Sequence, residues 1–174
     1  MSELLTIGEV RGIVKAALVE VRRAPTFRVE IGVVAAGAGF AAELIPGVGK
    51  GLKVHALYFS KPSVQVTLRL LKNSTPSTDG TSSDGPITPL DSRFPVSGGE
   101  RCKLFTAAPT AGIQVGSDLF EGVIGTGDIL YEEFGQNGQS PLVLRGSLET
   151  LGVYVSAAAT IVGYIEFSEA KNED

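Results

Sequence analysis

Four groups of residues in this sequence could do chemistry: a histidine, a cysteine, adjacent carboxylates and a Gly-Lys turn. His55 is the sole histidine, and it lies on the polar side of an alternating stretch, with no cysteine or acid at a useful spacing. Cys102 stands between Arg101 and Lys103, which would lower the pKa of an exposed thiol. Alternation instead places Cys102 on the opposite face from both cations. We therefore predict a buried structural thiol and a half-buried or surface histidine.

Adjacent carboxylates could form the acid/base pair of a glycosidase. Glu132 and Glu133, with Asp128 nearby, are the candidates. Neighbouring strand residues point to opposite faces, so Glu132 and Glu133 cannot serve one site together. Tryptophan is absent, which argues against a sugar-binding cleft because such clefts commonly stack sugars on aromatic rings. Four tyrosines could still supply ring platforms, although core or interface positions explain them equally well: Tyr58, Tyr131, Tyr154 and Tyr164.

The dipeptide Gly49-Lys50 superficially resembles part of a phosphate loop. That motif needs a glycine at the position of Leu44 and Ser or Thr at the position of Gly51, and neither is present. The net charge of −4 and the lack of a basic stripe interleaved with aromatics argue against nucleic acid as a partner. We predict no catalytic residue, no metal ligand and no cofactor, and hence no enzyme.

These residues must be positioned by strands. Leu52 to Tyr58 and Val64 to Leu70 alternate between apolar and polar residues, which is typical of strands with one buried face. Pro62 breaks the pattern between them, because it lacks an N–H and restricts the preceding residue. The two stretches therefore predict a strand–turn–strand pair in an antiparallel sheet.

Further short strands follow at regular spacing with turn signals between them, and without helical patterns. Such strands favour two packed sheets, and we predict a mainly β protein with a jelly-roll-like antiparallel β-sandwich over residues 27–168. The additional strands are Phe27 to Val33, Phe40 to Leu44, Arg101 to Thr106, Ile113 to Val115 running into Leu119 to Ile124, Ile129 to Phe134, Leu142 to Arg145, Leu151 to Val155 and Ile161 to Phe167.

Length and composition fit this architecture. A chain of 174 residues is expected to form one domain that folds without disulfides, and its single cysteine cannot form an intrachain bridge. The longest apolar stretch, residues 31–42, is too short to span a bilayer, and no signal peptide is evident at the start. We expect a soluble protein, made in the cytoplasm, with no membrane partner.

Residues 1–26 show a different period and predict a short N-terminal helical arm. Thr6 and Glu9 form a capping-box pattern, and Pro25 ends the helix. The apolar stripe either packs on the β body or reaches a neighbouring subunit or a larger scaffold. Its members are spaced three and four residues apart and are our candidates for oligomer or capsid contact: Ile7, Val10, Val14, Ala17 and Val21.

Residues 74–100 are rich in Ser, Thr, Gly and Pro and predict an exposed loop. Asp79, Asp84 and Asp91 lack the alternating spacing of a calcium loop. Long loops in compact domains are often functional, so we take this loop as a partner contact. Its candidate residues are Asp79, Asp84, Asp91 and Arg93. At the end of the chain, the polar residues 169–174 predict a disordered tail.

Two runs in the β region resemble a known family: Gly39 to Leu57, and Leu148 to Phe167 with its Ser/Ala-rich turn and its ending Gly163-Tyr164-Ile165-Glu166. Together they look like the small single-domain jelly-roll virion proteins of tailed bacteriophages, over residues 27–168. The resemblance implies a non-enzymatic protein that decorates or cements the capsid, commonly a homotrimer. It implies no catalytic residues.

The resemblance leaves three hypotheses for the function. The first is capsid decoration at the virion surface, after synthesis in the host cytoplasm, with the major capsid protein or another virion protein as partner. The second is a host-recognition module of a head or tail fibre that binds a surface glycan or receptor through the loop at 74–100. The third is a generic adaptor or connector, because a folded sandwich is compatible with all three.

Overall fold

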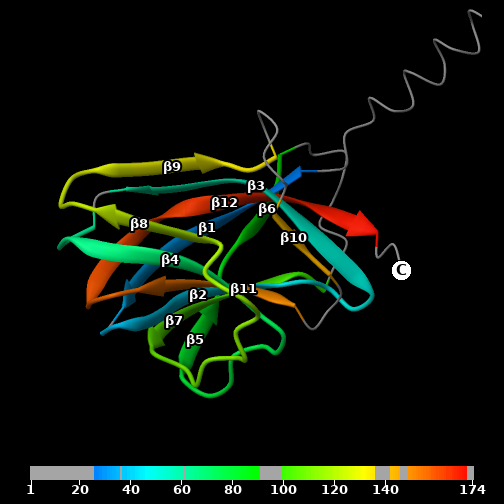
Figure 1. The fold of residues 1–174 in the computed structure, drawn as a ribbon, viewed down its shortest axis with the longest axis horizontal. Coiled ribbons are helices and arrows are strands. Elements are labelled where there is room, and N and C mark those ends of the chain that lie inside the picture. Colours follow the sequence, from blue (N-terminus) through cyan, green and yellow to red (C-terminus); the bar gives the residue numbers. More distant parts are fainter. Residues whose placement is uncertain are drawn as a thin grey trace, which may run out of the picture.

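The computed structural model describes residues 26–35, 37–60, 62–90, 99–135, 142–145 and 149–171. Within this part of the chain every regular element is a strand, and the strands form two six-stranded sheets (Figure 1). Every pairing between neighbouring strands is antiparallel. The described residues contain no helix long and apolar enough to cross a membrane.

The first sheet contains both the earliest and the latest described strands. Its order is β10 (Leu142–Leu144), β3 (Lys50–Ser60), β12 (Ala159–Lys171), β1 (Thr26–Ala35) and β6 (Ile87–Pro89), and β9 (Ile129–Glu133) also pairs with β3. β9 and β10 share one side of β3, since β9 pairs with residues 56–60 and β10 with residues 52–54.

The second sheet contains the remaining strands. Its order is β5 (Thr81–Asp84), β7 (Arg101–Ala107), β2 (Gly39–Ile45), β11 (Thr150–Val155), β4 (Val66–Asn73) and β8 (Phe120–Ile124). The connections β1–β2, β2–β3, β3–β4, β8–β9 and β11–β12 all cross from one sheet to the other. The two central strands, β11 and β12, are also the last two strands along the described chain.

The hydrophobic core lies between the two sheets. The inward residues of β12 alternate as the sequence predicts, with Ile161, Ile165 and Phe167 at most 2% exposed. They pack in one cluster with apolar residues of the second sheet such as Leu44 and Leu70. The mainly β, sandwich-like architecture expected from alternation is therefore confirmed.

A smaller cluster lies on the outer face of the second sheet. Phe40, Leu71 and Phe105 are nearly fully buried there, and Tyr154 packs against them. The segments after β4 and before β8 lie over this face: the backbone N–H of Ser77 donates to the carboxylate of Glu43, an outward-facing residue of β2, and Asp118 accepts hydrogen bonds from Arg69 of β4. These two segments cover part of the outer face of the second sheet.

The predicted pairing of the two central alternating stretches is wrong. β3 belongs to the first sheet and β4 to the second, so they face each other across the core. Alternation shows which face of a strand is apolar, and two strands on opposite sides of one core present the same pattern as two paired strands. Val64, expected on the buried face, precedes β4 and is 43% exposed.

The loop expected over residues 74–100 contains two short strands. β5 pairs with β7, and β6 pairs with β1, although all four residues of β5 are exposed as expected. Ile113 to Val115, predicted as a strand, contributes a single bridge through Gln114 to Asn73. The sequence did not predict these two strands because their apolar content is low. They are held by backbone hydrogen bonds to their partner strands, which composition does not report.

The tail expected from residue 169 is also corrected. β12 continues to Lys171 and pairs there with the first residues of β3. Lys50 of β3 lies 3.1 Å from a carboxylate oxygen of Glu169, which adds an ion pair to this end of the ladder. The predicted N-terminal helix and its stripe at Ile7, Val10, Val14, Ala17 and Val21 lie outside the described residues, except that Thr26 begins β1.

Candidate functional site

Cys102 is a buried structural thiol, as the alternation predicts. It faces inward from β7, is 1% exposed, and belongs to the main core cluster. Burial raises the pKa of the Cys102 thiol to about 12, and the nearby carboxylates of Glu43 and Asp84 add to this effect. A thiol that stays protonated is a poor nucleophile.

His55 is half-buried, in agreement with the sequence analysis. Its Nε2 lies 2.8 Å from the hydroxyl oxygen of Ser168. Burial lowers the pKa of His55, and the positive charge of Lys53 lowers it further, while Glu166 has the opposite effect. Burial therefore favours the neutral imidazole, and its hydrogen bond to Ser168 joins β3 to β12.

The acidic residues of the predicted sites do not converge. Asp79 occupies a turn with φ of 61° and accepts a 3.4 Å hydrogen bond from the hydroxyl of Thr110. Asp84 is exposed at the end of β5. Asp91 and Arg93 lie outside the described residues. Within the described ranges, no group of three or more His, Cys, Asp or Glu side chains could hold a metal ion.

A different surface gathers aromatic and charged side chains: the outer face of the first sheet. The strand register places outward residues of β9, β3, β12 and β1 in three rows. We call this surface the tyrosine face. Its rows are Ile129, Ser60, Val162 and Gly32; then Tyr131, Tyr58, Tyr164 and Glu30; then Glu133, Ala56, Glu166 and Arg28.

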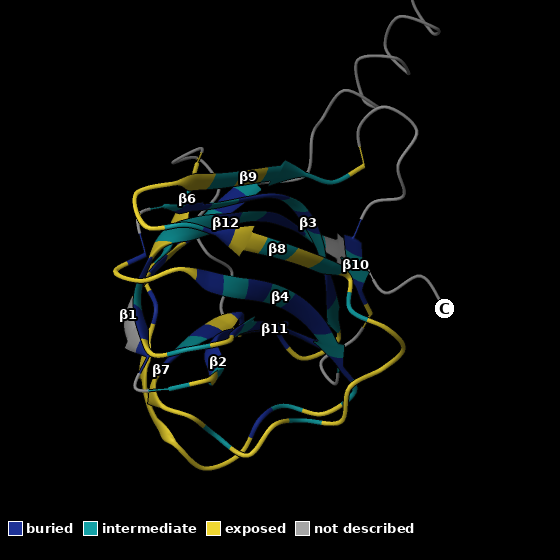
Figure 2. Cartoon of the chain, turned by 60° about the vertical axis from the view of Figure 1, so that its left-hand side comes forward, coloured by how far each residue is buried: buried dark blue, intermediate teal, exposed yellow. Residues whose placement is uncertain are grey.

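Large side chains of this face are open to solvent. Ile129 is 60% exposed, Tyr131 52% and Val162 50%, and all three lie in the first two rows. β9 lies at the margin of the sheet, where Figure 2 shows exposed residues along the strand. Because opposite residues of paired strands lie about 5 Å apart, these side chains form one continuous surface.

Aromatic stacking and one ion pair order the middle of the face. The rings of Tyr58 and Tyr164 stack with centroids 5.2 Å apart and planes 15° apart. The guanidinium of Arg28 lies 4.1 Å from the centroid of the Tyr164 ring and donates a 2.6 Å hydrogen bond to Glu166. Stacked rings with a cation over one of them lose little freedom on binding, which suits a contact surface.

At the margin, the hydroxyl of Tyr131 donates a short hydrogen bond to the carboxylate of Glu133. This bond to a carboxylate raises the pKa of Tyr131 to about 12. Glu132 points to the other side of β9, so the two adjacent glutamates serve different environments, as alternation requires. The margin of the face thus presents an aromatic ring beside a carboxylate.

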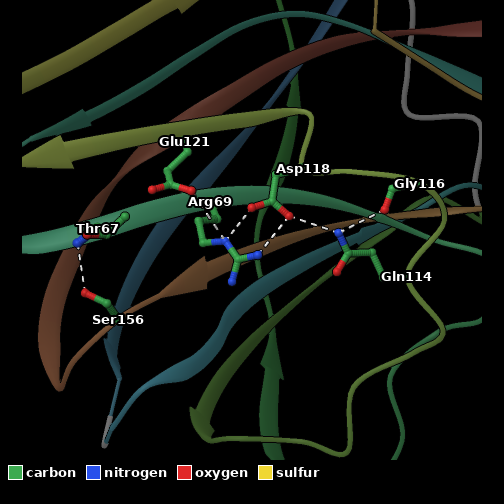
Figure 3. A network of polar contacts seen from close by, with 7 residues as sticks. All are labelled: Thr67, Arg69, Gln114, Gly116, Asp118, Glu121 and Ser156. Atoms are coloured by element: carbon green, nitrogen blue, oxygen red, sulfur yellow. Dashed lines mark hydrogen bonds and ion pairs between the residues drawn. The ribbon is translucent and has the colours of Figure 1, made fainter.

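A second polar network lies on the outer face of the second sheet (Figure 3). Arg69 donates two hydrogen bonds of 2.5 and 2.9 Å to Asp118, whose carboxylate also accepts one from Gln114 at 2.9 Å. The pKa of Asp118 is lowered, chiefly by the bond from Arg69. This network fastens the segment before β8 to β4, so its role is structural.

The sequence analysis identified the individual tyrosines but missed their convergence. Tyr164 stands with Glu166 on the polar side of its stretch, which was the available signal. Alternation groups Tyr58 with the apolar Leu52 and Val54, and this is wrong: the ladder between β3 and β12 shifts register between Glu166 and Phe167, so that Leu57 and Phe59 point into the core instead. The adjacency of the tyrosines depends on the order β9–β3–β12, which alternation does not specify. No family model, no curated protein and no solved structure matches this chain.

Proposed function

We propose that this chain is a non-enzymatic structural protein of a tailed-phage virion, which decorates or stabilises the capsid as an oligomer by surface binding. The observation that carries the proposal is the tyrosine face, an exposed and ordered contact surface of tyrosines, aliphatic side chains and an arginine. Tyrosine and arginine are the residues in which binding energy concentrates at protein interfaces. The partners are further copies of the chain and the major capsid protein or another virion protein.

We further propose that the sandwich is a jelly roll. Two features of the strand order support this: the run β1–β12–β3–β9 in one sheet, and the run β2–β11–β4–β8 in the other. Such an order places strands from the two ends of the chain side by side, and successive strands alternate between the sheets except for the paired β4 and β8, as in two nested Greek keys. β5, β6 and β7 then form an insertion between the fourth and fifth strands of the roll.

Binding to particles tests the decoration proposal. The purified chain is mixed with phage capsids that lack it, and bound protein is counted after sedimentation. We expect saturation at a fixed number of copies per particle, because capsid symmetry offers a fixed number of equivalent sites. Val14→Lys in the predicted stripe should reduce binding, while Ser2→Lys, outside the stripe, should not. Unsaturable binding, or none, contradicts the proposal.

A second candidate function is recognition of a host-surface glycan by a head or tail fibre. The observation that favours it is the exposed Tyr131 ring beside the Glu133 carboxylate, since a sugar ring can stack on the one and donate hydroxyl hydrogen bonds to the other. A glycan array tests it. Saturable binding to particular glycans, lost in Tyr131→Ala and kept in Tyr154→Phe, is the expected result. Uniform signal over all sugars contradicts it.

A further inference from the structure

We propose that the tyrosine face binds the tyrosine face of a second copy of this chain, about a two-fold axis that runs parallel to the strands between β3 and β12. This inference concerns self-association and does not depend on what the protein decorates. It rests on the distribution of charge across the face, on the exposed apolar rows, and on the cover over the opposite sheet.

The third row has opposite charges at its two ends. Glu133 stands on β9 and Arg28 on β1, with two strands between them. At a strand spacing of about 4.8 Å, the two backbones lie about 14 Å apart, too far for an ion pair within the chain. The side chain of Arg28 is 37% exposed and pairs with Glu166 through one terminal nitrogen, and no ion pair to Glu133 is found among the described residues. Because a guanidinium has five N–H donors, a second carboxylate can still bind Arg28.

A two-fold axis along the strands exchanges the two ends of every row. It places Glu133 of one copy opposite Arg28 of the second copy, and it does so twice. In the second row it places Tyr58 opposite Tyr164 and Tyr131 opposite Glu30, and in the first row Ser60 opposite Val162 and Ile129 opposite Gly32. In the third row it also places Glu166 opposite Ala56, and Glu166 keeps its ion pair with Arg28 of the same chain. Sheets packed face to face lie about 10 Å apart with nearly aligned strands, and side chains of this size fill that gap. The face is therefore complementary to itself, as an isologous contact requires.

The alternative two-fold axis in the plane of the face, perpendicular to the strands, fails this test. It would exchange the first and third rows, so that Ile129 and Val162 would be buried against Glu133 and Glu166. Glu133 and Glu166 each have one partner within their own chain, Tyr131 and Arg28, but an aliphatic group opposite them offers no further one, whereas the axis along the strands places Glu133 opposite Arg28. The row order thus selects one orientation of the second copy.

The other outer face of the sandwich does not offer an equivalent surface. The segments after β4 and before β8 cover part of it, with Ser77 bonded to Glu43 and Asp118 bonded to Arg69. Phe40 and Phe105 are buried beneath this cover. Single aliphatic side chains such as Val123 and Ile113 are exposed on that side, but the exposed aromatic ring of Tyr131 lies on the tyrosine face.

Light scattering during size-exclusion chromatography, with sedimentation equilibrium over a range of concentrations, tests the proposal on the full chain. A single chain has a mass of 18.1 kDa, and we expect the wild-type protein to reach twice this value with increasing concentration. Val162→Arg introduces a guanidinium at both symmetry-related sites and should raise the dimer dissociation constant by at least about tenfold. Val48→Arg is the matched control, because Val48 is 91% exposed in the turn before β3, away from the face.

A charge exchange provides the second, independent variant set. Glu133→Arg should weaken the dimer by a similar factor, since it opposes two like charges across the axis. The double variant Glu133→Arg with Arg28→Glu restores opposite charges across the axis and should bind more tightly than either single variant, a coupling that two independent substitutions would not show. It should stay weaker than the wild type, because Arg28→Glu also removes the ion pair with Glu166. Glu121→Arg, on β8, is the control for the added charge. Far-ultraviolet circular dichroism reports folding of each variant.

Several results would overturn this inference: a wild-type protein that stays a single chain at all concentrations, a mass of three chains, or Val162→Arg indistinguishable from Val48→Arg. Failure of the double variant to bind more tightly than either single variant, when it folds, counts equally against the two-fold axis. Capsid binding is measured separately, so a wild-type protein that stays a single chain but still binds particles would reject this contact and leave the decoration proposal standing.

Discussion

Glu43 offers the sharpest test of the packing described above. This residue of β2 is fully buried, and its carboxylate accepts hydrogen bonds of 3.0 and 3.2 Å from the backbone N–H of Ser77. It also accepts a 2.6 Å bond from the hydroxyl of Thr150, which is itself fully buried. Through these bonds one side chain fastens the excursion after β4 to two strands of the second sheet.

Replacing Glu43 with alanine leaves a buried N–H and a buried hydroxyl without their acceptor. Each hydrogen bond to a charged group contributes roughly 1.5–3 kcal/mol, and water entering the vacated space offsets part of the loss. We therefore expect Glu43→Ala to lower the free energy of unfolding by about 3 kcal/mol. For a chain of this size, that corresponds to a fall in Tm of about 6–12 °C. Glu43→Gln keeps one acceptor oxygen, so its free energy of unfolding should lie between those of the wild type and Glu43→Ala.

The assay is urea unfolding followed by circular dichroism, together with amide hydrogen exchange at Ser77. Glu121→Ala is the control, because that side chain is 61% exposed and its loss should change stability by less than about 0.5 kcal/mol. The Ser77 amide should exchange faster in Glu43→Ala than in the control. If Glu43→Ala and Glu121→Ala unfold at the same urea concentration, the role we assign to this carboxylate is wrong.

Three further predictions address single sites. Cys102 should resist a thiol reagent at pH ~8 in the folded protein and react fully after denaturation, because the buried thiol stays protonated; rapid native labelling would contradict its placement. Burial lowers the pKa of His55 below its usual value of about 6.5, so the unfolded chain takes up a proton more readily than the folded one, and the free energy of unfolding should fall as the pH drops below about 6.5. In urea unfolding at a series of pH values, His55→Gln should show a weaker dependence of stability on pH than the wild type. An unchanged pH dependence would refute this prediction. Gly163→Ala should lower the free energy of unfolding in urea by about 1–3 kcal/mol, because the new Cβ would lie 2.0 Å from the carbonyl oxygen of Tyr58. The control is Gly32→Ala on the neighbouring strand, where the new Cβ meets nothing within 4 Å and the change should be neutral or slightly stabilising. Equal effects of the two substitutions would contradict the strand register.

Alternation in the sequence predicted local structure well, because it reports directly on which side of a strand is buried. It placed Cys102 inward, and it assigned Ile161, Ile165 and Phe167 to one buried face, as the structure shows. It also predicted strands close to the observed bounds of β1, β2, β7 and β11. These are properties of consecutive residues, and they need no knowledge of the partner strand.

Pairing between distant strands was beyond the reach of the same signal. β3 and β4 have matching apolar faces and follow each other in the sequence, which suggested that they pair. The connection between them instead leads from the first sheet to the second. The tyrosine face shows the same limit, because Tyr58 meets Tyr164 through a pairing that spans more than a hundred residues. The exposed strand β5 was not predicted because its composition resembles that of a loop. It is held by backbone hydrogen bonds to β7.

The central position of β11 and β12 has a consequence for synthesis on the ribosome. β12 lies between β1 and β3, and β11 lies between β2 and β4, so each sheet lacks its middle strand until residues 150–171 have been made. A nascent chain that stops short of this point exposes the unpaired margins and apolar faces of β1 to β4, which are substrates for chaperones and sites of aggregation. Closure of both sheets is therefore one late event, in which the final strands join segments translated between 77 residues (Thr150 to Asn73) and 142 residues (Ser168 to Thr26) earlier.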